Sequence, residues 1–102
     1  MQLNQDPEGF LLNLDDWSEN VAIAIAAQDD IILSDDHWRV VFAVRDFFEH
    51  FESSPSMRQL VRFLKRDNED IASSVALLKL FPGSPAKFAA KIAGLPKPEN
   101  CL

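Results

Sequence analysis

The sequence contains only one cysteine, Cys101, and two histidines, His37 and His50, among its 102 residues. One thiol cannot form an internal disulfide, and it cannot build a cysteine-rich zinc or iron–sulfur site. With so few other ligands, no structural metal site and no cofactor are expected. A sequence with a single thiol also suits a reducing compartment, so we expect a cytoplasmic protein.

A long hydrophobic run is also missing. The longest apolar stretch, residues 21–27, is far shorter than the ~20 residues that a membrane span needs. The start of the chain, MQLNQD, has no basic region followed by an apolar run, so no secretory signal is expected. The length of 102 residues and a composition of 47% hydrophobic and 25% charged residues predict one globular domain with one modest core.

Basic residues are scarce in the first half of the chain. Residues 1–56 carry 12 acidic and 2 basic side chains, whereas residues 57–102 carry 4 acidic and 8 basic ones, and the net charge is −6. The acidic half would repel nucleic acid, and the basic half suits an acidic protein surface or a phosphate group. The cysteine lies in the basic half.

Apolar periodicity between turn signals predicts five helices, over about residues 16–28, 35–52, 55–65, 69–80 and 86–93. The expected helix starts are Asp15 or Asp16, Ser34, Ser54-Pro55 and Ser84-Pro85. Gly94 is expected to close the last helix in a left-handed conformation. His37, beside Trp38 at the start of the second helix, is expected to be structural. The second helix has a wide apolar stripe that only Arg45 interrupts.

Asp6-Pro7-Glu8-Gly9 is a turn sequence, and the next three residues suit a short strand, so we expect a short or vestigial N-terminal β-hairpin. Pro96 and Pro98 remove backbone donors and fix φ, which excludes a helix there. The predicted fold is mainly α: residues 1–94 form a small orthogonal bundle of about five helices, and residues 95–102 form a flexible, extended C-terminal arm.

The predicted arm carries the lone thiol. Seven residues from Gly94 to Cys101 reach roughly 20 Å at about 3.1 Å per residue. A thiol on such an arm can enter a partner's pocket, which a thiol on the domain body cannot do. The alternative is an incidental cysteine on a frayed tail, and its position alone does not separate the two.

The predicted third helix has a basic face, formed by Arg58, Arg62, Lys65 and Arg66. Such a face is usually just solvated, but it could also receive the arm or dock a partner. Lys97, Arg58 and Lys91 are therefore candidate contacts of the arm or of a partner. A helix-turn-helix nucleic-acid binder is a rival hypothesis, with the basic face on phosphates, although the overall acidity argues against it.

A series of motifs resembles the TusE/DsrC family in order across about residues 8–102. The tail motif is Gly94-Leu95-Pro96-Lys97-Pro98, two more residues, and then Cys101 before a final leucine. The other motifs are Glu8-Gly9-Phe10-Leu11 with Trp17, Leu33-Ser34 with His37-Trp38, Val44-Arg45-Asp46-Phe47, Ser54-Pro55 with Arg58 and Leu60-Val61, and Leu80-Phe81-Pro82-Gly83-Ser84-Pro85-Ala86-Lys87.

The resemblance implies a sulfurtransferase that carries sulfur as a persulfide on Cys101. It implies a TusBCD-like complex as the sulfur donor and an MnmA-like tRNA 2-thiouridylase as the acceptor, with tRNA involved only indirectly. The DsrC branch, a partner subunit of dissimilatory sulfite reductase, carries a second cysteine eleven residues before the terminal one. That position is Ala90 here. The sequence therefore resembles the TusE branch, and a DsrC-like subunit is the alternative.

The local charges around the thiol are mixed. An ordinary cysteine, with a pKa near 8.5, is only a few per cent thiolate at neutral pH. Lys97 favours the anion, whereas Glu99 and the terminal carboxylate oppose it. The arm has no histidine base, so we expect the partners to activate the thiol.

Overall fold

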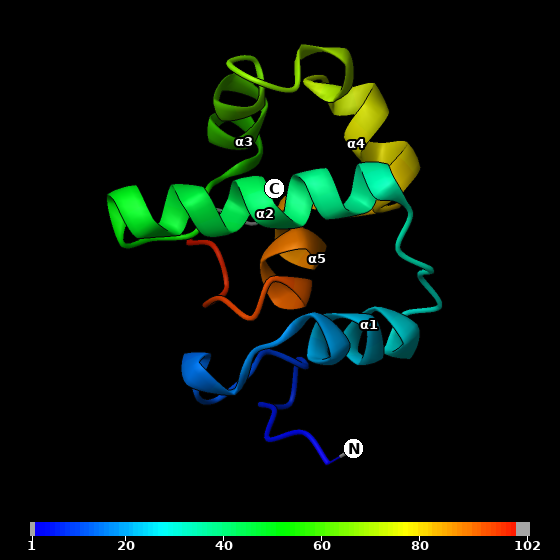
Figure 1. Ribbon diagram of the computed structural model, residues 1–102, viewed down its shortest axis with the longest axis vertical. Helices are drawn as coiled ribbons and strands as arrows, with labels where there is room; N and C mark the ends of the chain where they lie inside the picture. The colour runs from blue at the N-terminus through cyan, green and yellow to red at the C-terminus, as the bar shows by residue number, and fades with distance from the viewer. Residues whose placement is uncertain (1, 100–102) are drawn as a thin grey trace.

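A computed structural model describes residues 2–99, which contain five α-helices and two short 3-10 helices. The elements in chain order are η1 (Leu14–Asp16), α1 (Glu19–Gln28), α2 (Asp35–Phe51), α3 (Met57–Leu64), η2 (Glu69–Ile71), α4 (Ser74–Leu80) and α5 (Pro85–Ile92). Figure 1 shows α2 crossing the molecule, with α1 on one side and α3 and α4 on the other. The prediction of a mainly α bundle of about five helices is confirmed.

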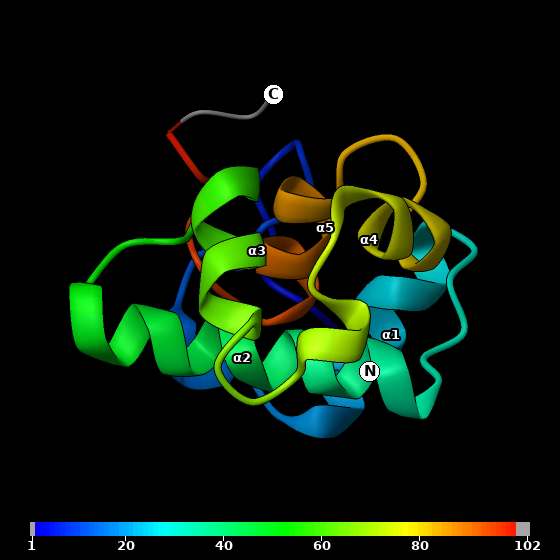
Figure 2. The same cartoon turned by 90° about the horizontal axis from the view of Figure 1, so that it is seen from above.

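Helix α5 lies at the centre of the bundle, where it contacts each of the other four α-helices. Figures 1 and 2 show it enclosed by them in two perpendicular views. Its inward positions are small, with Ala89 and Ala90 both fully buried, which lets the surrounding helices approach closely. Because α5 is central, the chain that follows it starts from the middle of the molecule.

The core around α5 is built from aliphatic side chains of the neighbouring helices. The fully buried ones include Ile25 of α1, Val40, Val41 and Val44 of α2, Leu60 and Leu64 of α3, and Leu77 of α4. Burying each such side chain contributes roughly 1.5–3 kcal/mol. The core therefore positions all five helices around one another and around the start of the C-terminal segment.

The start of α2 is the one that the sequence predicts. The Ser34 hydroxyl accepts from the backbone N–H of His37, and the Ser34 N–H donates to His37 Nδ1 over 3.1 Å. His37 Nε2 lies 2.7 Å from the carbonyl oxygen of Leu80. Because a carbonyl only accepts, Nε2 carries the proton and Nδ1 is the acceptor. His37 thus joins α2 to the end of α4, in agreement with its predicted structural role.

Two predicted helix starts are wrong. Helix α1 is capped by Ser18 rather than by Asp15 or Asp16, because the Asn13 side chain closes η1 first and Trp17 lies in an extended link between η1 and α1. Helix α3 is capped by Ser56, whose hydroxyl accepts from the Gln59 N–H, rather than starting at Ser54-Pro55. In both places the sequence offers several possible caps close together, and tertiary contacts decide between them.

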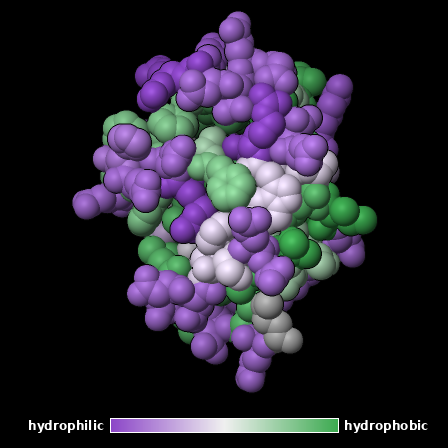
Figure 3. All heavy atoms as spheres, in the orientation of Figure 1, coloured by the Kyte–Doolittle hydropathy of each residue, from purple (hydrophilic) through white to green (hydrophobic). Residues whose placement is uncertain are grey.

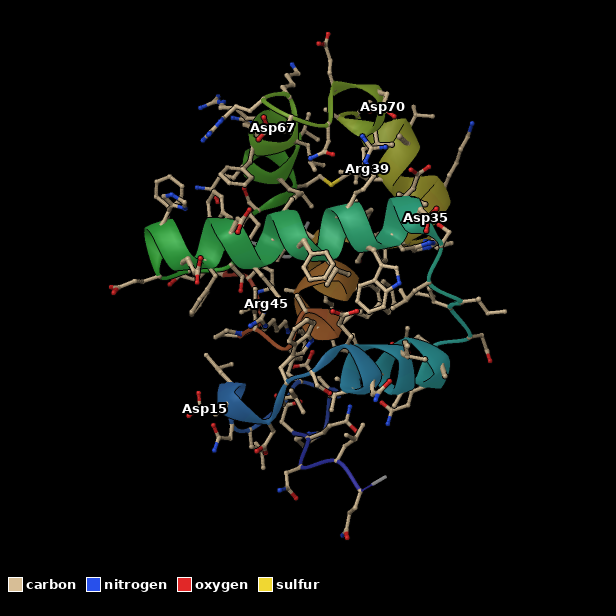
Figure 4. The ribbon with its side chains drawn as sticks, in the orientation of Figure 1. Asp15, Asp35, Arg39, Arg45, Asp67 and Asp70 are labelled. Atoms are coloured by element: carbon tan, nitrogen blue, oxygen red, sulfur yellow. The ribbon has the colours of Figure 1, made fainter. Side chains whose placement is uncertain are left out.

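The predicted fourth helix is divided into η2 and α4, with Ser73 as the cap of α4. Arg39 of α2 holds η2 in place: its guanidinium donates to Asp70 over 2.6 Å and to the Asn68 side chain over 2.9 Å (Figure 4). The arginine lowers the pKa of Asp70 below its ordinary value through these hydrogen bonds. The pair is exposed, so it orients the connection more than it stabilises the fold.

The N-terminal hairpin is indeed vestigial. Within residues 2–99 the only β-pairing is one isolated antiparallel bridge between Gln5 and Leu11. The Asp6 carboxylate closes the turn by accepting from the N–H groups of Glu8 and Phe10, each at 2.9 Å. In the described part of the chain, no helix has the length and apolar character to cross a membrane.

Helix α1 allows a matched test of this packing. Ile25 is fully buried, whereas Ile23 on the same helix is 51% exposed. We expect Ile25→Ala to lower the free energy of unfolding by about 2–5 kcal/mol, because it leaves a cavity in the core, and Ile23→Ala to lower it by less than about 1 kcal/mol. Urea denaturation of both variants measures the difference. Equal losses would contradict the packing of α1.

Candidate functional site

The site is the C-terminal end of α5 together with the segment that leaves it. Gly94 has φ +74°, the left-handed conformation that the sequence predicts. The N–H of Gly94 donates to the carbonyl of Lys91 over 3.1 Å, and the N–H of Leu95 donates to that of Ala90 over 3.0 Å. These two bonds form a Schellman motif, which ends the helix and turns the chain in a defined direction.

Two side chains from distant segments satisfy the last carbonyl groups of this end. Trp17 Nε1 donates to the carbonyl of Ile92 over 2.9 Å, and Arg45 of α2 donates to the carbonyl of Ala93 over 2.7 Å. The Arg45 guanidinium lies over the Trp17 ring, 3.8 Å from its centroid. A Cβ atom on Gly94 would lie only 2.4 Å from Trp17 Cδ1, so the indole also packs directly against the glycine. We call Trp17, Arg45 and Gly94 the α5 clamp.

Electrostatics favour Arg45 at this place. The carbonyl end of a helix carries partial negative charge, and a cation there stabilises the helix. Burial lowers the pKa of Arg45 from its ordinary value, while the charge of Glu49 opposes that shift, and an arginine remains protonated in either case. Figure 4 shows Arg45 extending from α2 into the space between α2 and the N-terminal segment.

The described part of the predicted arm lies against the body. Leu95 is 4% exposed, Pro98 is also buried, and the buried Ser54 hydroxyl donates to the carbonyl of Pro96 over 2.5 Å. The division of the chain at residue 94 stays a prediction. Cys101, the predicted catalytic residue, lies outside the described residues. In the sequence it comes three positions after Pro98, so the chain between them can span at most about 10 Å.

Lys97 is also anchored on the body. Its ammonium group lies 2.9 Å from one carboxylate oxygen of Glu8 and 3.2 Å from the other, and Lys87 of α5 lies 3.3 Å from the same carboxylate. The hydrogen bonds from Lys97 and then from Lys87 lower the pKa of Glu8 below its ordinary value. The N-terminal turn therefore contacts the predicted C-terminal arm.

The other two candidate contacts lie apart from Lys97. Lys91 is 7% exposed and faces inward, with its ammonium group 3.2 Å from Asp29. Arg58 is exposed on α3, in a basic groove of about 700 Å³ that Arg62 and Lys65 also line. The structure therefore does not gather the three predicted contact residues into one site. Whether Arg58 or Lys91 contacts a partner stays a prediction.

A groove of about 420 Å³ lies where the described chain ends, and we call it the exit groove. Pro96, Lys97 and Glu99 line one part of it, and residues of the loop 52–56, Gln59 of α3 and Phe48 of α2 line the rest. Among the described residues that line this groove, none is a histidine. The site therefore holds and directs the chain, but these residues provide no imidazole base for a thiol.

Comparison with known proteins identifies the family. The family model described as "DsrC like protein" matches residues 1–102. "Sulfurtransferase TusE" of Salmonella paratyphi A is 46% identical over 102 residues, covering 99% of this chain and 94% of the relative. The protein of the same name from Photorhabdus laumondii is 41% identical, covering 99% and 92%. The chain belongs to the DsrC-like family. The predicted TusE/DsrC membership is confirmed, and the names of these relatives support the predicted sulfurtransferase class and a role in sulfur relay.

Solved structures agree with this assignment. The NMR structure of Allochromatium vinosum DsrC superposes with a TM-score of 0.86 at 37% identity, covering 96% of this chain and 88% of that one. The crystal structure of the oxidized gamma-subunit of the dissimilatory sulfite reductase (DsrC) from Archaeoglobus fulgidus gives 0.84 at 36% identity, covering 100% and 94%. Ala90, at the position where the sequence analysis placed the DsrC branch's second cysteine, is fully buried here.

Sequence reasoning missed three residues that form this site. All three belong to motifs that carry the family resemblance, but Trp17 was expected inside a helix, Ser54 was expected to cap one, and Glu8 was expected in a turn, with no contact to the C-terminal segment. One available signal was Arg45, the single cation in an otherwise apolar stripe, because a charged side chain on a buried face needs an internal partner. That partner is the carbonyl of Ala93.

The α5 clamp predicts a difference between two glycines. Gly94 and Gly83 both have positive φ, but a Cβ at Gly83 would lie 3.9 Å from its nearest neighbour, Phe88. In both alanine variants, backbone strain should lower the free energy of unfolding by about 1 kcal/mol. Gly94→Ala should lose about 1–3 kcal/mol more, because its methyl group overlaps the Trp17 ring. Thermal denaturation of the two variants tests this, and equal losses would refute the close contact.

The ion pairs of Glu8 with Lys97 and Lys87 predict that the stability of the base of the arm depends on pH. Its pKa is lowered in the folded state, so its ion pairs stabilise the fold above the ordinary value of 4.5 and are lost as pH falls through the lower folded value. We expect Lys97→Met to raise the pKa of Glu8 toward 4.5, with Lys87 still holding it slightly below. A carboxyl-carbon NMR titration measures this. An unchanged Glu8 pKa in the variant would rule out the contact.

Proposed function

We propose that this protein carries sulfur as a persulfide on Cys101 between two protein partners. The proposed donor is a TusBCD-like complex, and the proposed acceptor is an MnmA-like enzyme that thiolates the wobble uridine of tRNA. In this proposal the protein works in the cytoplasm and contacts tRNA only indirectly. The main support is the fixed base of the arm, where Pro96 and Lys97, a few residues before Cys101, are held against the body.

Both steps are thiol–disulfide type exchanges that need no external oxidant. The Cys101 thiolate attacks the outer sulfur of the donor persulfide, the donor S–S bond breaks, and its electron pair leaves with the donor thiolate. Cys101 then holds the sulfur as a persulfide. In the second step an acceptor thiolate attacks that outer sulfur, and the Cys101 thiolate leaves. Each step forms one S–S bond and breaks one, so no net oxidation occurs.

The geometry supports a carrier more than a self-contained catalyst. The α5 clamp, Ser54 and Glu8 bind the segment up to Lys97, and each of these contacts positions backbone or side chain without supplying a base. In the sequence, Cys101 follows three positions after Pro98, the last buried residue within the described range 2–99. A short segment of that kind can enter a partner's pocket while the body remains outside. Activation of the thiolate then falls to the partner.

The alternative is a DsrC-like subunit of a dissimilatory sulfite reductase, like the Archaeoglobus fulgidus and Pyrobaculum aerophilum subunits whose structures are similar to this one. A second cysteine in the chain would permit an internal disulfide or trisulfide. With Ala90 buried in the core and Cys101 the sole cysteine of the sequence, that chemistry is not open to this protein. This observation favours the single-cysteine relay.

Intact mass spectrometry tests the proposal directly. After incubation with a persulfide-loaded TusBCD-like complex, the wild-type protein should gain the mass of one sulfur atom, and a reducing agent should remove it. Cys101→Ser should gain nothing. Its stability should stay within about 0.5 kcal/mol of the wild type, because the change leaves the contacts of Leu95, Pro96 and Lys97 in place.

The second half of the relay has its own measurement. Loaded wild-type protein mixed with an MnmA-like enzyme should lose its extra sulfur at the rate at which the enzyme gains it. If the wild type takes up no sulfur from any loaded donor, or if Cys101→Ser takes it up equally well, the proposed role of Cys101 is wrong.

A further inference from the structure

Beside the exit groove lies a second groove of about 650 Å³, which we call the aromatic groove. Phe47, Phe51 and Phe63 line its apolar part. Phe47 is 6% exposed, and the rings of Phe51 and Phe63 both pack on it, with centroids 4.6 Å and 5.4 Å away. Phe51 nevertheless remains 59% exposed. The groove therefore presents a large aromatic side chain that its neighbours already hold in place.

The same groove carries positive charge. Arg62 and Arg66 of α3 line it, and no acidic residue is among its lining residues. Neither arginine forms an ion pair with any of residues 2–99. The Arg66 guanidinium lies 5.8 Å from the centroid of the Phe63 ring, so it stands close to the apolar surface. In the space-filling view of Figure 3, hydrophobic side chains lie among hydrophilic ones over α2 and α3.

The aromatic groove is continuous with the exit groove. Ser53 and Gln59 line both, and the next residue after Ser53 is Ser54, which binds the carbonyl of Pro96. A protein that binds the arm must approach the body beside Pro96, Lys97 and Glu99, which line the exit groove. Phenylalanine and arginine side chains are enriched at protein–protein interfaces, and arginine is among the residues that most often contribute a large share of the binding energy.

We infer that the aromatic groove docks the protein partner that exchanges sulfur with Cys101. This inference rests on the proposed function. The matching surface on the partner carries an apolar side chain, which packs on Phe51, flanked by carboxylates, which pair with Arg62 and Arg66. The occupant follows from the charge of the groove, because unpaired guanidinium groups beside an apolar surface favour an acidic, partly apolar protein surface.

A nucleic acid is the other kind of ligand that binds arginine and aromatic side chains. The charge distribution favours a protein. Glu49 and Glu52 are exposed near the end of α2, and the whole chain carries −6, so an extended phosphate backbone would meet repulsion beyond the basic face of α3. A short carboxylate-bearing protein segment would contact only the two arginines.

The test compares Phe51→Ser and the double variant Arg62→Gln/Arg66→Gln with the wild type in both sulfur-transfer steps. The probes are a persulfide-loaded TusBCD-like complex and an MnmA-like enzyme. In at least one step, Phe51→Ser should raise the protein concentration for half-maximal transfer about tenfold or more, with little change in the maximal rate. The arginine variant should raise it several-fold and weaken its dependence on salt.

The chain offers matched controls away from the groove. Ile32 is 91% exposed in the link between α1 and α2, and Lys79 is exposed on α4. Ile32→Ser and Lys79→Gln should transfer sulfur like the wild type. Alkylation of Cys101 by iodoacetamide should proceed at one rate in all variants, because the groove is expected to bind the partner and not to change the thiol.

The outcomes separate this inference from the proposed function. If the wild type accepts no sulfur, the proposed function fails and the docking surface with it. If the wild type relays sulfur and the groove variants match it in both steps, the docking surface alone is wrong. Unchanged transfer with weakened binding of radiolabelled tRNA would also overturn it, since the groove would then bind nucleic acid.

Discussion

The rest of this structure depends on how the C-terminal end of α5 is closed. The last carbonyl groups of a helix have no partners within the helix, and here the indole of Trp17 and the guanidinium of Arg45 bind those of Ile92 and Ala93. Gly94 then turns the chain at a position where any side chain would overlap the Trp17 ring. Because α5 contacts every other α-helix, these contacts fix the start of the C-terminal segment relative to the whole body.

In this arrangement the body positions the C-terminal segment, and the arm carries the thiol that is proposed to react. The body contributes position: Ser54 and Glu8, from two separate loops, hold the segment at Pro96 and Lys97. The proposed chemistry resides in one thiol beyond these contacts, which a relay must offer to two partners in turn. In the proposed relay, the fixed base starts the segment that carries the thiol from the same place for both partners. In that proposal the partners, and not the body, supply the base that activates the thiol.

The sequence predicted the features that local signals control. Ser34 starts α2 and Gly94 ends the C-terminal turn as expected, because a cap and a left-handed glycine depend on neighbouring residues. It did not predict the clamp, since Trp17 bonds to a residue 75 positions away and Ser54 to one 42 positions away. Ser53, Ser54 and Ser56 lie within four consecutive positions around Pro55. Local capping preference therefore could not decide which serine caps α3. The family resemblance identified the proposed reactive cysteine, and the contacts that direct it required the structure.

Amide hydrogen exchange at Leu95 tests the central claim most directly. Its N–H donates to the carbonyl of Ala90, and the N–H of Ala93, bonded to Ala89, provides an internal reference within the same turn. If the α5 clamp fixes the base of the arm, the amide of Leu95 exchanges with protection close to that of Ala93. Exchange of Leu95 at the rate of an unstructured peptide, while Ala93 stays protected, would contradict the account.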